Sequence, residues 1–73
     1  MPRQLPHVKW DVVLERNPTT GVWVAEVVGV PGCYTQGASR AEALQNLREA
    51  FELVRATDGL PPPPQIEFTT IEA

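Results

Sequence analysis

One stretch of sequence decides the fold of this chain: Val30-Pro31-Gly32-Cys33-Tyr34-Thr35-Gln36-Gly37-Ala38-Ser39-Arg40-Ala41-Glu42-Ala43. Its Pro31-Gly32 pair predicts a turn, because proline presets φ and glycine tolerates positive φ. Residues 33–36 leave room for a strand of about four residues before Gly37 interrupts it. This strand-to-helix segment, residues 30–43, therefore predicts a sheet that passes directly into a helix.

The end of the strand-to-helix segment predicts where the helix begins. Ser39 stands three residues before Glu42, which is the spacing of a capping box. In such a box the serine hydroxyl accepts a hydrogen bond from the Glu42 backbone N–H, and the Glu42 carboxylate accepts one from the Ser39 N–H. We also expect Gly37 to require a positive φ. Six residues are assigned this structural role: Pro31, Gly32, Cys33, Gly37, Ser39 and Glu42.

The rest of the chain supplies the partners of this segment. Its patterns predict a strand over 8–15, a turn over 17–21, a strand over 22–28, a helix over 40–57 and a strand over 65–71. The order is β-β-β-α-β, an α+β domain in which one helix crosses one face of an antiparallel sheet. Residues 1–73 are expected to form this single domain, with an extended arm over 1–6 and a proline-rich connector over 60–64.

The predicted helix carries one apolar stripe. Leu44, Leu47, Phe51 and Val54 recur at helical spacing, and together they are wide enough to cover a small sheet. In the second strand both faces are fairly apolar, so periodicity does not say which of them meets the helix.

Composition limits the classes of function. The chain has 73 residues and a net charge of −3, which disfavours a nucleic-acid backbone as the main ligand. It has one cysteine and one histidine, so neither an internal disulfide nor a metal or cofactor site is expected. No apolar run has the length of a signal peptide core or a membrane span. We therefore expect a cytoplasmic protein.

Several residues could carry chemistry, and each has a simpler interpretation. His7 lacks an orienting partner for catalysis. Cys33 has no cation beside it in sequence to lower its pKa, so a packed thiol is expected. Trp10 and Trp23 could stack nucleotide bases, but packing in a core or an interface is the better interpretation for an acidic chain. No catalytic residue is therefore assigned, and the chain is not expected to be an enzyme.

Three carboxylates are the best candidates for meeting a basic partner. Asp11, Glu15 and Glu26 fall at positions that could share one surface of the sheet. Paired carboxylates can also act as acid and base or hold a divalent cation. Exposed strand positions must be polar in any case, so a solvated face is the simplest explanation of all three.

The strand-to-helix segment also carries a resemblance. The motif that begins in this segment and continues to Ala50, Pro-Gly-Cys-x-Thr-Gln-Gly followed by a capping residue and Glu-Ala-Leu-x-Asn-x-x-Glu-Ala, resembles the HicB family, the antitoxin halves of HicA–HicB toxin–antitoxin pairs. The matching positions are Pro31, Gly32, Cys33, Thr35, Gln36, Gly37, Ser39, Glu42, Ala43, Leu44, Asn46, Glu49 and Ala50. The resemblance extends from about Lys9 to Pro64 and implies a domain like the double-stranded-RNA-binding domain or a partial RNase H fold.

The same resemblance implies a function. HicB domains dock on a small mRNA-cleaving toxin and block its active site, so a HicA-type toxin is the expected partner. Many members continue into a domain that binds operator DNA; this chain ends at Ala73, and direct DNA binding is not expected. The alternative is an orphan homo-oligomeric scaffold or small-ligand-binding domain without a toxin. A homodimer is expected because so small a sheet leaves unpaired edges.

Overall fold

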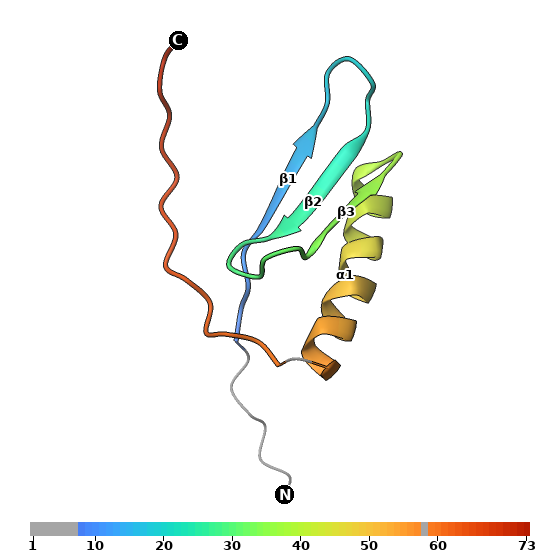
Figure 1. Ribbon diagram of the computed structural model, residues 1–73. Coiled ribbons are helices and arrows are strands. Elements are labelled where there is room, and N and C mark those ends of the chain that lie inside the picture. Colours follow the sequence, from blue (N-terminus) through green and yellow to red (C-terminus); the bar gives the residue numbers. More distant parts are fainter. Residues whose placement is uncertain (1–7, 58) are drawn as a thin grey trace, which may run out of the picture.

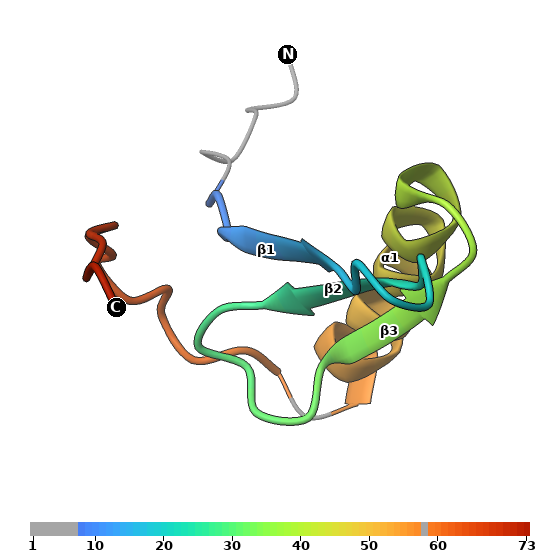
Figure 2. The same cartoon turned by 90° about the horizontal axis from the view of Figure 1, so that it is seen from above.

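The computed structural model describes residues 8–57 and 59–73. It contains three strands, β1 (Val12–Arg16), β2 (Trp23–Val27) and β3 (Tyr34–Gly37), followed by one helix, α1 (Arg40–Thr57). The strands form an antiparallel sheet in the order β1-β2-β3. The helix lies across one face of the sheet, as Figures 1 and 2 show. The predicted α+β class is confirmed for these four elements.

The first hairpin is closed by Asn17, whose side-chain Oδ1 accepts hydrogen bonds from the backbone N–H groups of Thr19 (2.8 Å) and Thr20 (3.2 Å). The Asn17 N–H donates to the Val22 carbonyl at 2.9 Å. Asparagine holds turns in this way because its short side chain reaches the backbone two or three residues later. The predicted turn is therefore confirmed, and the register of β1 on β2 follows from it.

The strand-to-helix segment forms most of the predicted contacts. Gly32 has a φ of +80°, as the Pro31-Gly32 turn requires. The Cys33 carbonyl accepts a hydrogen bond from Val27 N–H at 3.0 Å, which continues the pairing of β2 with β3. The Ser39 hydroxyl accepts the Glu42 N–H at 3.1 Å, so the helix cap is confirmed. Only that half of the capping box forms among the described residues, since no bond joins the Glu42 carboxylate to the Ser39 N–H.

Gly37 is needed for a different reason from the one predicted. Its φ is not positive, unlike that of Gly32. A Cβ at Gly37 would instead lie 2.9 Å from Ala43 Cα and 3.0 Å from the Glu42 carbonyl carbon. Glycine is therefore required because the first turn of α1 rests directly on the backbone of β3, which leaves no room for a side chain.

The core lies between the helix and the sheet face formed by alternate residues of the strands. In β2, Trp23, Ala25 and Val27 lie on the helix side, which settles the choice that periodicity left open. Small side chains dominate the fully packed centre. Its buried residues are Ala25, Val27, Val30, Cys33, Ala43 and Leu47, with Trp10, Leu14, Trp23, Ala50, Phe51, Val54 and Leu60 packed around them.

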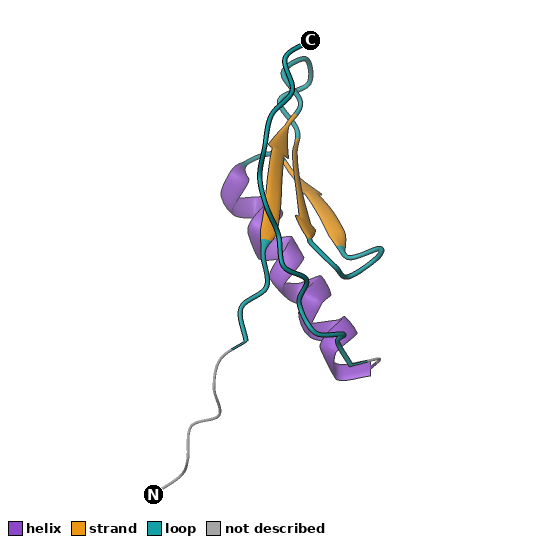
Figure 3. Cartoon of the chain, turned by 90° about the vertical axis from the view of Figure 1, so that its left-hand side faces the viewer, coloured by secondary structure: helices purple, strands orange, loops and turns teal. Residues whose placement is uncertain are grey.

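The predicted fourth strand is not formed. Residues 65–71 pair with no strand. Figure 3 draws them as loop, and in Figure 1 their extended trace runs outside the sheet. Phe68 and Ile71 are 76% and 91% exposed. The alternating pattern of this segment indicates a strand with one buried face, yet the described part of this single chain provides no partner for it. The predicted β-β-β-α-β order is thus wrong in its last element.

The connector over 60–64 leads from the helix to the turn between β2 and β3. Leu60 packs on the core, and Pro64 sits against Gly29, where a Cβ would lie 2.9 Å from Pro64 Cγ. This contact fixes the point from which the C-terminal segment leaves the domain. The predicted arm over 1–6 lies outside the described residues. No helix in the described part of the chain is long and apolar enough to cross a membrane.

Candidate functional site

The sheet face opposite the helix is the candidate site. Cross-strand partners share a face in an antiparallel sheet, and the register pairs Val13 with Glu26, and Glu26 with Tyr34. Because Ala25 and Val27 point into the core, Glu26 and its partners point away from it. We call this surface the open face; its positions are Asp11, Val13, Glu15, Val24, Glu26, Val28, Tyr34 and Gln36.

The three predicted carboxylates all lie on the open face. Glu26 is opposite Val13, so Asp11 and Glu15, two residues before and after Val13, are its diagonal neighbours. Diagonal neighbours in such a sheet are about 7–8 Å apart at the backbone. Asp11 lies just before β1, but its carbonyl accepts the Val28 N–H at 2.9 Å, which keeps it in the sheet. All three are exposed.

The open face combines these charges with an apolar centre. Val13, Val24 and Val28 are half-buried, and Tyr34 is 60% exposed. The strand positions of this face include no lysine or arginine, so its charge is negative. A face of this kind offers apolar area and carboxylates together, which suits a partner with basic side chains around an apolar patch.

Two side chains keep the helix on the other face and so leave this one open. Thr35 Oγ1 donates to the Ala43 carbonyl at 2.8 Å, and Asn46 Nδ2 donates to the Gln36 carbonyl at 2.9 Å. They tie α1 to β3 near the Gly37 contact. Sequence reasoning included both residues only as motif matches. Thr35 and Asn46 are polar residues next to apolar positions of the strand and the helix. This is the sequence signal that could have indicated their hydrogen-bonding role.

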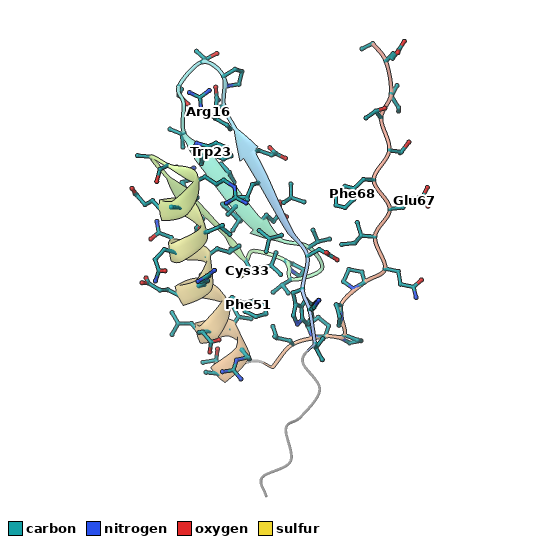
Figure 4. The ribbon with its side chains drawn as sticks, turned by 180° about the vertical axis from the view of Figure 1, so that it is seen from behind. Arg16, Trp23, Cys33, Phe51, Glu67 and Phe68 are labelled. Atoms are coloured by element: carbon teal, nitrogen blue, oxygen red, sulfur yellow. The ribbon has the colours of Figure 1, made fainter. Side chains whose placement is uncertain are left out.

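The other candidate residues take packing roles. Cys33 is 2% exposed, and burial raises the pKa of its thiol, so the thiolate is disfavoured. Trp10 packs edge-on against Phe51, with ring centroids 5.9 Å apart, and Trp23 packs beside the core. Figure 4 shows Cys33 and Phe51 on the helix side of the sheet. His7 lies outside the described residues. Among the described residues no group of three His, Cys, Asp or Glu could hold a metal ion.

A groove lies at the β1 side of the helix, apart from the open face. It has a volume of about 320 Å³ and is lined by Val8, Trp10, Val12, Val27, Leu44, Leu47, Arg48 and Phe51. The helix packs on β3 and β2, so this side of β1 is incompletely covered and Val12 is 37% exposed. The lining is apolar except for Arg48. We call this feature the β1 groove.

Three curated relatives are similar to part of this chain. The UPF0150 protein Ta0767 of Thermoplasma acidophilum is 40% identical over 44 residues, which are 60% of this chain and 62% of the relative. A UPF0150 protein of Archaeoglobus fulgidus is 37% identical over 46 residues, 63% of this chain and 65% of the relative. The UPF0150 protein ssr1258 of Synechocystis is 40% identical over 42 residues, 58% of this chain and 59% of the relative.

The chain thus spans about three-fifths of the length of the curated relatives it matches. Their names state no activity. No protein-family model matches the chain, and no solved structure matches it significantly. The comparisons therefore support similarity to UPF0150 proteins over about 60% of the chain.

Proposed function

We propose that this protein is a HicB-like antitoxin module that binds and neutralises a small, basic, mRNA-cleaving toxin of the HicA type. The motif resemblance over the strand-to-helix segment supplies the class of partner. The observation that carries the proposal is the open face, where Asp11, Glu15 and Glu26 surround an apolar centre. The toxin binds on this face and is inhibited by contact alone.

The chemistry of the two surfaces supports this mode of binding. A ribonuclease of this kind holds RNA phosphates with basic side chains, since phosphate contacts dominate nucleic-acid affinity. The carboxylates of the open face are negatively charged, as RNA phosphates are, so they can pair with the same basic side chains. Val13, Val24 and Tyr34 then supply the apolar area that an interface needs at its centre. Bound there, the antitoxin excludes the RNA from the toxin.

Co-expression tests the proposal directly. If the gene beside this one encodes a small basic protein, that protein is produced with and without this chain, and growth and cleavage of a reporter mRNA are measured. Rescue of growth, protection of the mRNA and a stable complex of the two chains are the expected results. If the neighbouring protein remains toxic in the presence of this chain, or if the two do not form a complex, the proposal is wrong.

An orphan homo-oligomeric scaffold is a second candidate, and one observation favours it. The exposed C-terminal segment carries apolar side chains that nothing covers in the described part of the single chain. That observation concerns a different surface from the open face, so self-association and toxin binding are compatible.

A further inference from the structure

We propose that two copies of this chain exchange their C-terminal segments, residues 65–71, each of which adds a strand to the free edge of the other copy's β1 and places Phe68 in its β1 groove. Four observations carry this inference. They concern the segment, the point from which it leaves the domain, the strand edge and the groove.

The segment already has the conformation and pattern of a strand. Residues 65–71 follow an extended trace in Figure 1, and alternate residues point to opposite sides of such a backbone. Figure 4 shows Phe68 on the side facing the sheet and Glu67 on the opposite side. Phe68 nevertheless remains 76% exposed. The ring of Phe68 is thus a large apolar group left uncovered on the side that faces the sheet, and we infer that a partner covers it.

The connector holds this segment away from its own sheet. Pro64 rests against the backbone of Gly29, and Leu60 is packed on the core, so the chain is anchored up to the start of the segment. From that point it runs on the β1 side of the domain without pairing to it (Figure 1). An anchored, extended and unpaired end is the element that domain exchange uses at little cost.

The receiving edge has unpaired backbone groups. The Asp11 carbonyl accepts the Val28 N–H and the Asn17 N–H donates to the Val22 carbonyl, just beyond the two ends of β2, which fixes the alternation of the ladder between them. By that alternation the N–H and C=O groups of Val12, Leu14 and Arg16 point away from β2. No strand in the described part of the chain pairs with this edge. It is therefore open to an added strand, the contact that edge strands invite.

The groove fits the side chain that the strand would bring. Val12 lies on the helix side of the sheet, where the groove is. A strand added beside β1 therefore places every second one of its side chains over the groove. The groove of about 320 Å³ exceeds the cavity of about 150 Å³ that holds benzene in an apolar protein core. It therefore has room for the ring of Phe68 together with a neighbouring side chain.

Charge is compatible with this placement. Residues 65–73 carry no basic residue, and Arg48 is the charged residue of the β1 groove, so the incoming segment brings no like charge to it. In a two-fold exchange the β1 edge of each copy is paired, because each copy donates one segment and receives one. The result is a closed dimer rather than an open chain of molecules.

Isotope-mixed NMR tests the exchange without any variant. Equal amounts of 13C-labelled and unlabelled wild-type chain are unfolded, mixed and refolded, and only contacts between labelled and unlabelled copies are recorded. We expect contacts between the Phe68 ring and the methyl groups of Val12 and Leu44 across copies. If the Phe68 ring contacts those methyl groups only within one chain, or does not contact them, the proposal is overturned.

Sedimentation of matched variants gives an independent test. The wild type should sediment at micromolar concentration as a species of twice 8.1 kDa, and Phe68→Asp should sediment as a folded monomer. Leu53→Asp is the control, because Leu53 is similarly exposed at 69% but lies outside the β1 groove, and it should remain dimeric. A monomeric wild type, or a Phe68→Asp variant that stays dimeric, contradicts the exchange. Neither measurement requires a toxin, so failure here is distinct from failure of the antitoxin proposal.

Discussion

Ser39 stabilises the domain by capping the start of α1. Replacing it with alanine removes the hydroxyl that accepts the Glu42 N–H and should cost about 0.5–2 kcal/mol. In a domain of this size that lowers the melting temperature by roughly 4–8 °C per kcal/mol. Ser39→Asp preserves a cap and should melt close to the wild type. An alanine variant with unchanged stability but lost toxin binding would make Ser39 a contact residue and contradict its structural role.

Gly37 shows why one residue type can be needed for two different reasons. A methyl group there meets the backbone of Ala43 and Glu42, and neither can move without shifting the start of α1. We expect Gly37→Ala to destabilise the fold by about 1–3 kcal/mol, the usual cost of overpacking. Urea unfolding measures it. A variant as stable as the wild type would mean that the helix does not rest on β3 at this point.

The buried thiol of Cys33 predicts a pH dependence. Because burial raises its pKa in the folded state, the unfolded chain releases this proton first as the pH rises. Above the ordinary thiol pKa the unfolded state then binds fewer protons, so this group lowers the free energy of unfolding with increasing pH. Cys33→Ala should reduce that fall. Thiol labelling at pH 8 should also be at least about tenfold slower in the folded than in the unfolded protein, since the thiolate is disfavoured and shielded; equal rates would contradict the burial.

At the scale of elements, sequence patterns predicted whatever depends on local chemistry. The turn at Asn17, the short strand after Gly32 and the helix that begins after Ser39 all depend on neighbouring residues, and all are present. Strand ends shifted by a residue or more, since the predicted strand over 8–15 forms only as Val12–Arg16. Such ends depend on pairing, which a local pattern does not contain.

Features that depend on contacts distant in sequence were missed. Both faces of β2 are apolar, so only the packed helix determines that Ala25 and Val27 point inward. The segment over 65–71 has the alternation of a half-buried strand, but alternation reports that a face is buried and not which chain buries it. The same limit applies to the site, where strand parity placed Asp11 with Glu15 and only the register brought Glu26 beside them.

At the scale of the whole molecule, a small core is combined with two separate surfaces for which we propose partners. Among the residues that the structure describes, the six buried apolar ones include no aromatic side chain, and a domain of this length buries only about 60% of its unfolded surface. If the proposed partners bind, their contacts should therefore add measurably to its stability. The open face is proposed to take the toxin, while the free edge of β1 and its groove take a second copy, so one molecule can do both.

The central claim is that the open face neutralises a basic toxin through its three carboxylates, and calorimetric titration with a HicA-type toxin tests it most directly. Asp11→Asn, Glu15→Gln and Glu26→Gln are combined in one variant. A control variant combines Glu42→Gln, Glu49→Gln and Glu52→Gln on α1, with the same change in net charge. Desolvated charge pairs at an interface are worth about 1.5 kcal/mol or more, so the open-face variant should bind at least about tenfold more weakly and lose much of its salt dependence. The control should bind like the wild type; equal weakening of both variants, or of neither, would contradict the claim.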